Sequence, residues 1–276
     1  MTIKKFKFIK AIVGILLSTT VLVGCGGNAN EKEADKAGGE PKTIVIGTGN
    51  AFKPYCYLDD SGNLSGYEIE VLKEINRKLP QYKFEFNQLE FKNILLSLES
   101  NKVDVGAHQF EKNPERESKY LFGTESYTNF ILRITVGKDR TDIKSIKDLE
   151  GKKVQTSAGS NDAYMLEQYN KEHNNAINLV YTSGLDAATT IKNIEDGRID
   201  AFVSIKRIVD SYNQTYGEKL KTVGDPIATS NTYYVFRKED TKLQGEFDKA
   251  LKELKADGTL AKISIKILGG DYTTNE

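Results

Sequence analysis

The sequence predicts an α/β fold in which helices pack on a mainly parallel sheet. The first observation is that short apolar extended runs alternate with helical patterns. Residues 43–47, 83–86 and 103–107 are typical of strands, and residues 66–79 and 91–98 of amphipathic helices. This order indicates parallel pairing, because parallel neighbours need a crossover connection that is usually a helix. The second observation is that a similar alternation returns later in the chain.

The later block lies between two extended segments, residues 130–136 and 232–237. Strands and helices alternate inside it, with strands ending at Val180 and covering 197–203 and helices covering 162–169 and 185–194. Two more helices are expected after the second segment, over residues 243–254 and 260–268. The two blocks resemble each other in architecture and not in sequence.

The composition excludes several classes of function. The chain has 276 residues, 38% hydrophobic and 28% charged, which is ordinary for a globular protein with one large or two modest cores. Its 39 lysines and arginines balance 39 acids without a basic stripe, so no nucleic-acid partner is expected. Two histidines, with Cys56 as the sole cysteine after Cys25, predict no metal site, and we expect no cofactor.

The N-terminus has the pattern of an export leader. Residues 1–24 carry four lysines, no acid and an apolar run that is shorter than the roughly 20 residues of a membrane-spanning helix. The run ends in Leu-Val-Gly-Cys25, which resembles a bacterial lipobox and implies cleavage before Cys25 and lipidation of its thiol. The alternative is an ordinary signal peptide with an incidental cysteine. Residues 25–42 are then the lipidated cysteine and a flexible tether.

The most informative stretch is residues 104–116. We expect a strand, a polar loop from His108 to Asn113, and a helix that starts at Pro114 with Asn113 as its N-cap. Arg116 then lies in the first helical turn, where its guanidinium can bind a carboxylate through two parallel hydrogen bonds beside a helix N-terminus. The alternative is that Arg116 is a solvated helix residue.

The loops at residues 48–52 and 108–111 both follow predicted strands. We therefore expect both at the carboxyl edge of the sheet, where ligands bind in such folds. Other residues have plainer interpretations. By the period of two, His108 would face away from Gln109 and be a buried, satisfied histidine, and Glu68 would lie on a helix surface or at a lobe contact.

An ordered set of short motifs resembles family 3 solute-binding proteins of ABC importers, the polar amino acid-binding group. The motifs are Ile46-Gly47-Thr48, Phe52-Lys53-Pro54, Gly66-Tyr67-Glu68-Ile69-Glu70, Lys102-Val103-Asp104, Glu115-Arg116, Asp148-Leu149, Gly159-Ser160, Gly197-Arg198-Ile199-Asp200-Ala201 and Asp257-Gly258-Thr259. The resemblance implies a two-lobed clamp of the type II periplasmic-binding-protein kind, with two hinge crossings and the ligand between the lobes. Lobe 1 would comprise residues 43–130 and 232–276, and lobe 2 residues 131–231.

The resemblance also implies site residues. Two aromatic side chains, two polar residues after the third strand, an arginine for the α-carboxylate and a helix start would contact the ligand; they are Phe52, Phe91, Gln109, Glu111, Arg116, Ser160 and Asn161. Phe52 and Phe91 have the alternative of being core residues. The family usually places an aspartate for the α-ammonium where this chain has Ile205. Glu111 or Asp225 could substitute, or the ligand is not a plain α-amino acid.

These implications define the expected function. The protein would be a monomeric, lipid-anchored, extracytoplasmic binding protein without enzyme activity that delivers a polar amino acid to an ABC permease and its ATPase. The loop at residues 109–116 resembles that of cystine binders and favours cystine. One alternative is a cyclohexadienyl or arogenate dehydratase on the same fold, with His108 and Glu111 as the obvious acid or base candidates. The other is a ligand sensor that does not take part in transport.

The lipobox interpretation predicts that Cys25→Ser releases the protein from the membrane fraction, because the thiol that would carry the lipid is lost. Membrane fractionation with immunoblotting measures this. Cys56→Ala leaves the proposed attachment site intact and is the matched control. Retention of the Cys25→Ser protein in the membrane fraction would contradict the interpretation.

Overall fold

The computed structural model describes residues 40–182 and 186–274. The predicted leader, residues 1–24, and the predicted lipid attachment site, Cys25, lie outside these ranges. None of the helices in the described ranges combines the length and the apolar character that a membrane span requires. The fold described below is that of the part that follows the predicted tether.

The predicted alternation of strands and helices is confirmed in the first part of the chain. Its main elements are β1 (Lys42–Thr48), α1 (Tyr67–Lys78), β5 (Tyr82–Gln88), α2 (Phe91–Glu99) and β6 (Val105–Glu111). A separate small sheet occupies the segment after β1 and consists of β2 (Ala51–Phe52), β3 (Cys56–Leu58) and β4 (Leu64–Ser65). β1 pairs in parallel with both β5 and β6, as helical crossovers allow.

The second part repeats this architecture. It is reached through α3 (Pro114–Lys119), β7 (Leu121–Phe122) and β8 (Thr128–Gly137). It contains the 3₁₀ helix η1 (Ile146–Leu149), β9 (Lys153–Ser157), α4 (Asn161–Glu172), β10 (Asn178–Thr182), α5 (Ala187–Glu195), β11 (Ala201–Ile205) and α6 (Lys206–Tyr216). The chain returns through β12 (Leu220–Phe236), α7 (Thr241–Ala256) and α8 (Thr259–Leu268).

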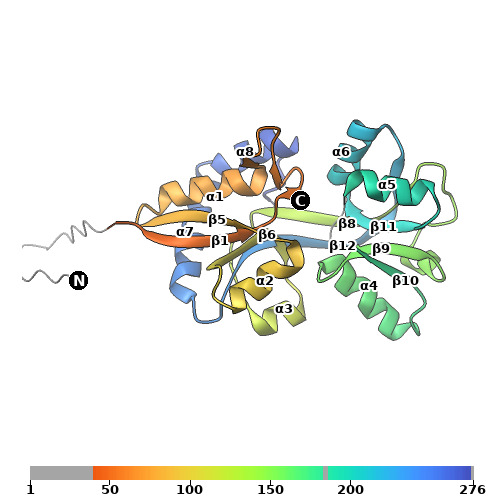
Figure 1. The fold of residues 1–276 in the computed structure, drawn as a ribbon, viewed down its shortest axis with the longest axis horizontal. Coiled ribbons are helices and arrows are strands. Elements are labelled where there is room, and N and C mark those ends of the chain that lie inside the picture. The colour runs from red at the N-terminus through yellow and green to blue at the C-terminus, as the bar shows by residue number, and fades with distance from the viewer. Residues whose placement is uncertain (1–39, 183–185, 275–276) are drawn as a thin grey trace, which may run out of the picture. The chain divides into compact units, whose positions relative to one another are not determined.

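One nine-stranded sheet runs through both parts. Its order is β10-β9-β11-β8-β12-β6-β1-β5, with β7 paired to β12. The long strands β8 and β12 pair antiparallel and join the two groups of elements (Figure 1). We call β1–β7 with α1–α3, α7 and α8 lobe 1, and β9–β11 with η1 and α4–α6 lobe 2. The predicted two-lobed fold with two crossings is therefore confirmed.

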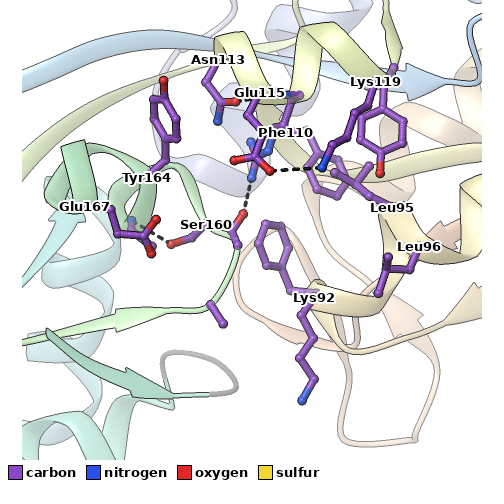
Figure 2. Close-up of a pocket in the computed structure, with 16 residues that line it drawn as sticks. Lys92, Leu95, Leu96, Phe110, Asn113, Glu115, Lys119, Ser160, Tyr164 and Glu167 are labelled. Atoms are coloured by element: carbon purple, nitrogen blue, oxygen red, sulfur yellow. Dashed lines mark hydrogen bonds and ion pairs between the residues drawn. The ribbon is translucent and has the colours of Figure 1, made fainter. Parts of the chain in front are cut away.

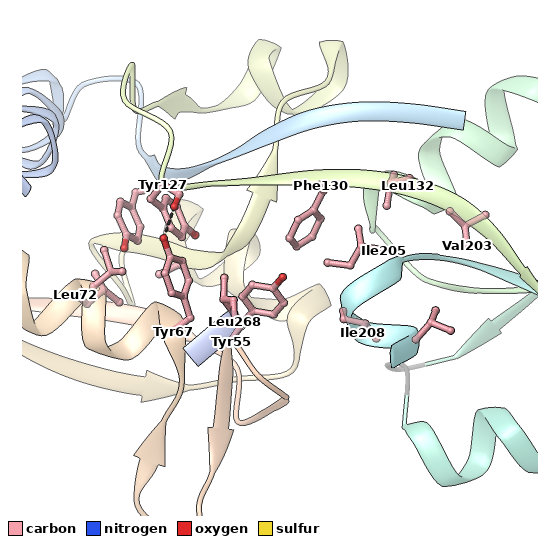
Figure 3. Close-up of a cluster of buried hydrophobic side chains, with 14 of the residues drawn as sticks. Tyr55, Tyr67, Leu72, Tyr127, Phe130, Leu132, Val203, Ile205, Ile208 and Leu268 are labelled. Atoms are coloured by element: carbon pink, nitrogen blue, oxygen red, sulfur yellow. Dashed lines mark hydrogen bonds between the residues drawn. The ribbon is translucent and has the colours of Figure 1, made fainter. Parts of the chain in front are cut away.

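The main hydrophobic core also runs through both lobes. Figure 3 shows Tyr67 and Leu72 of lobe 1, Phe130 of β8, and Ile205 and Ile208 of lobe 2 in the same cluster. All five side chains are buried. Burying an aliphatic or aromatic side chain of this size contributes roughly 1.5–3 kcal/mol to the free energy of unfolding. The apolar contacts therefore stabilise the crossing region as well as each lobe.

Helix α1 begins at a position that requires glycine. Gly66 has a φ of 117°, and a Cβ there would lie 2.3 Å from the carbonyl oxygen of Tyr55. This close approach brings the small sheet against the start of α1. As a result Tyr67 and Glu68, the first two residues of the helix, are both fully buried.

One local prediction is wrong, and one helix was not predicted. The loop expected from His108 to Asn113 is partly strand, because β6 continues to Glu111 and pairs with Thr232 of β12. The polar side chains of this segment gave no strand pattern in the sequence, and the pairing of its backbone with β12 is a tertiary contact. Helix α6 was also not predicted, because it follows β11 directly and no turn residue marks its start.

Candidate functional site

A cavity of about 560 Å³ lies between the two lobes. The carboxyl ends of β1 and β6 and the start of α4 contribute to its lining. All seven residues predicted to bind a ligand line it: Phe52, Phe91, Gln109, Glu111, Arg116, Ser160 and Asn161. The lining also includes residues for which the sequence predicted no ligand contact, among them Asn50, Gln88, His108, Asp162 and Asp186. The structure therefore brings the predicted set together and extends it.

Three rings form one side of the cavity, which we call the aromatic wall (Phe52, His108 and Phe91). The rings of Phe52 and His108 stack with centroids 5.1 Å apart and an interplanar angle of 7°. Phe91 packs on His108 at 4.9 Å. Burial lowers the pKa of His108 to about 4, so the imidazole is neutral at pH 7. The wall is therefore an uncharged surface, in which Phe52 and His108 are parallel and Phe91 is tilted by 57° to His108.

The expectation that His108 faces away from the cavity is wrong. The period of two applies to a regular strand, but Gln109 has a φ of 54°, in the left-handed region. This turn of the backbone breaks the alternation within β6. His108 and Gln109 consequently both line the cavity although they are consecutive residues.

Arg116 is held at the boundary between the lobes. Asn113 caps α3 as predicted, since its side chain accepts a hydrogen bond from the Arg116 N–H at 2.9 Å. The guanidinium is buried and donates to two carbonyl oxygens, those of Glu111 and of Gly159 in lobe 2, each at 2.7 Å. A carboxylate is a stronger partner for guanidinium than a carbonyl, so this geometry suits exchange of Gly159 for an anionic ligand.

Glu111 is a buried acid next to Arg116. Its carboxylate accepts hydrogen bonds from Ser230 of β12 and from Nδ2 of Asn161, at 3.2 Å in the second case. Burial raises its pKa to about 7, although the Ser230 bond and the Arg116 charge oppose the rise. A cation placed beside Glu111 would favour its ionised form and gain a charged partner.

The start of α4 contributes to the same cavity from lobe 2. Ser160 is its N-cap and accepts a hydrogen bond from the Ala163 N–H at 3.1 Å. The first N–H groups of a helix favour an anion. Asp162 in this turn accepts a hydrogen bond from Thr156 at 2.6 Å, and burial raises the pKa of its carboxyl. The predicted helix start is confirmed, and it lies next to Arg116, which bonds the carbonyl oxygen of the preceding Gly159.

The usual ammonium position of the family carries no charge here. Ile205 is 2% exposed and belongs to the apolar cluster that contains Phe130 and Leu132 (Figure 3). It is not among the residues that line the cavity, and neither is the exposed Asp225. The acids that do line the cavity are Glu90, Glu111, Asp162 and Asp186. Asp186 is the N-cap of α5, so an aspartate before a helical pattern was the available signal.

A second cavity of about 320 Å³ borders the first. Phe91, Arg116 and Ser160 line both. Figure 2 shows that much of the rest of its lining comes from α2, α3 and α4, including Leu96, Lys119 and Tyr164, and Phe110 of β6 also contributes. Lys119 is paired with Glu115 at 3.2 Å. We interpret this cavity as the outer part of the same cleft between the lobes.

The fold and the cavity are those of a two-lobed solute-binding protein. The sequence profile of the bacterial extracellular solute-binding proteins, family 3, matches residues 44–270, and the chain belongs to this family. Within the described residues, no group of three or more His, Cys, Asp or Glu side chains is arranged to hold a metal ion. The family is one of transport solute-binding proteins, which points to binding and not to catalysis.

Several relatives cover nearly the whole chain. The L-cystine-binding protein TcyK of Bacillus subtilis (strain 168) is 41% identical over 267 residues, which are 96% of this chain and 98% of that protein. A solved structure described as a putative L-cystine ABC transporter from Listeria monocytogenes has a TM-score of 0.80 and 44% identity, over 84% of this chain and 98% of that one. A structure reported for glutathione import via GshT and the cystine ABC importer TcyBC of Streptococcus mutans has a TM-score of 0.77 and 33% identity, over 85% and 98%.

The buried state of Glu111 predicts a pH-dependent effect of Glu111→Gln on the ligand-free protein. The pKa of Glu111 is raised from 4.5 to about 7 in the folded state, so folding favours the neutral acid. The wild type therefore loses stability as the pH rises from about 4.5 to about 7, and the loss is complete above that pH. Glutamine is neutral at every pH, so Glu111→Gln avoids a loss of roughly 3 kcal/mol in the free energy of unfolding.

Chemical denaturation at pH 5 and pH 8 measures this effect. The gain in the free energy of unfolding from Glu111→Gln should be larger at pH 8. Glu115→Gln on the exposed side of α3 is the control and should show no such difference. An equal gain at both pH values would mean that Glu111 does not titrate in this range.

Proposed function

We propose that this chain is the substrate-binding protein of an ABC importer and that its ligand is L-cystine. The observation that carries the proposal is that a buried guanidinium and a buried acid, Arg116 and Glu111, line the same cavity. A zwitterionic α-amino acid offers a carboxylate to the first and an ammonium to the second. The naming of several relatives as cystine-binding proteins supports the choice of ligand within this class.

Each site residue has a role in this proposal. Arg116 and the first N–H groups of α4, at Ser160 and Asn161, bind one α-carboxylate. Glu111 binds the neighbouring α-ammonium and replaces the aspartate that the family usually has at the position of Ile205. This places the negative charge on lobe 1, whereas the usual aspartate lies on lobe 2.

The remaining part of cystine is apolar at its centre and charged at its far end. Phe52 and Phe91, with His108 between them, contact the disulfide, because sulfur packs favourably on aromatic rings. The second ammonium lies towards the exposed acids Glu90 and Asp186. Gln109 contributes to the cavity wall, since its side-chain amide is bonded to Glu68 and Thr232.

The proposal also includes closure of the lobes, their bounds in the chain and attachment to the membrane. Cystine capture is accompanied by closure of lobe 2 on lobe 1, and the contacts of Arg116 with Gly159 and of Asn161 with Glu111 support such closure. Residues 43–130, 131–231 and 232–276 remain the proposed division into lobes. The protein acts as a monomer held at the outer face of the cell membrane through Cys25, where it delivers cystine to the permease and its ATPase.

A thermal-melt screen of the purified protein against all amino acids, cystine and several dipeptides tests the ligand. A ligand at 100 times its Kd stabilises by about 2.7 kcal/mol, which corresponds to a Tm shift of roughly 5–10 °C for a protein of this size. We expect the largest shift with L-cystine. A shift with another amino acid and none with cystine would overturn the ligand, and no shift with any amino acid would overturn the binding class.

Arg116→Lys tests the carboxylate clamp. Lysine keeps the positive charge but loses the planar fork of donors, so cystine binding should weaken by roughly 1.5–3 kcal/mol. Isothermal titration calorimetry measures the change in Kd. Arg77→Lys on the exposed face of α1 is the matched control, because Arg77 pairs with Glu74 at the surface. Unchanged affinity in Arg116→Lys would show that Arg116 does not bind the ligand carboxylate.

A further inference from the structure

A buried acid lies directly behind the cavity wall. Glu68, in the first turn of α1, has no exposed surface, whereas the sequence placed it on a helix surface or at a lobe contact. The close packing of Gly66 on the backbone of Pro54 and Tyr55 buries this turn, which is why that expectation is wrong. Burial raises the pKa of Glu68 to about 7, and its hydrogen bonds favour the charged form. Glu68 does not line the cavity, so the roles assigned above do not use it.

The donors to Glu68 come from one strand residue and one tyrosine. Oε2 of Glu68 accepts from the Gln109 backbone N–H at 3.0 Å and from Gln109 Nε2 at 2.9 Å. Oε1 accepts from the Tyr127 hydroxyl at 2.6 Å. The same hydroxyl accepts a second bond from the Gln109 N–H at 3.1 Å. Both donor groups of Gln109 are therefore directed at the buried acid.

Gln109 is the residue that most needs such support. Its φ of 54° lies in a region that residues other than glycine rarely adopt inside a strand. The pairing of β6 with β12 is regular at Phe110 and Glu111, and its register shifts between Tyr233 and Val235, next to Gln109. The Gln109 N–H thus leaves the strand ladder and is satisfied by Glu68 and Tyr127 instead.

The backbone turn at Gln109 decides which side chains form the cavity. In a regular strand His108 and Gln109 would point to opposite faces. Here His108, Gln109 and Glu111 all line the cavity, and His108 completes the aromatic wall. A change in the turn would therefore remove His108 from the wall or Glu111 from its place beside Arg116.

We propose that Glu68 is a positioning residue for ligand binding, which holds Gln109 in the left-handed conformation that turns His108 and Glu111 into the cavity together. The inference rests on the proposed function, because it concerns the affinity of the same cavity for cystine. It goes beyond that function in assigning a role to a residue that does not touch the ligand.

A double-mutant cycle on the full-length protein tests the inference. Glu68→Met keeps the approximate length of the side chain and removes both acceptor oxygens. It should weaken cystine binding about 10-fold or more, as expected for coupled residues in one hydrogen-bond network. Glu68→Gln keeps one oxygen and should have a smaller effect in the same direction. Glu70→Met, a partly exposed position two residues along α1 whose side chain pairs with Lys73, is the matched control and should leave the Kd unchanged.

The second side of the cycle uses Gln109→Gly, because glycine adopts a positive φ without support. In that background, Glu68→Met should change the Kd by less than about 3-fold, since the turn no longer depends on the acid. A purely structural role of Glu68 would give the same loss in both backgrounds and would overturn the proposal. If Glu68→Met does not fold, Glu68→Gln and Tyr127→Phe replace it in the cycle.

Hydrogen exchange of the Gln109 backbone amide gives a readout that needs no ligand. The amide should exchange slowly in the wild type and in Glu70→Met, and at least about 10-fold faster in Glu68→Met or in Tyr127→Phe. Unchanged protection in these variants would overturn the positioning role even if cystine binds. Failure of the wild type to bind cystine, with loss of protection in the variants, would instead overturn only the proposed ligand.

Discussion

The antiparallel pairing of β8 with β12 is the constraint on which the rest of the structure depends. These two strands carry the chain out of lobe 1 and back into it, and they pair along most of their length. Because the parallel strands of each lobe end beside this pair, the carboxyl ends of β1 and β6 and the start of α4 meet at one cavity. The apolar cluster around Phe130 and Ile205 packs against the same strands. The position of the site therefore follows from the topology, and its chemistry follows from a few side chains.

That chemistry depends on where charge is buried. Arg116 and Glu111 are close enough to influence each other, yet each is bonded mainly to neutral groups, carbonyls in one case and a hydroxyl and an amide in the other. Burial lowers the pKa of the guanidinium and raises that of the acid, which means that both charges lack full solvation. A zwitterion supplies the missing charge to both groups at once. The apolar Ile205 fits this arrangement, because it is buried in the apolar cluster and does not line the cavity.

Much of the fold could be predicted from the sequence. The spacing of apolar residues gave α1, α2 and α7, and Asn113 and Ser160 marked two helix starts correctly. The seven predicted site residues all line one cavity, although their roles remain proposals. The sequence could not reveal the turn at Gln109, since it depends on Glu68 and Tyr127, which are distant in the chain. The placements of His108 and Glu68 were wrong because both depend on tertiary contacts and not on local pattern: the backbone turn at Gln109 in the first case and the close packing at Gly66 in the second.

The central claim is that the cavity binds cystine as a zwitterion between Arg116 and Glu111. A crystal structure of the protein with L-cystine tests it most directly. We expect one α-carboxylate to be bonded to the Arg116 guanidinium in place of the Gly159 carbonyl, and the adjacent α-ammonium to lie within hydrogen-bond distance of the Glu111 carboxylate. Cystine bound with its ammonium away from Glu111, or with Arg116 still bonded to Gly159, would contradict the account.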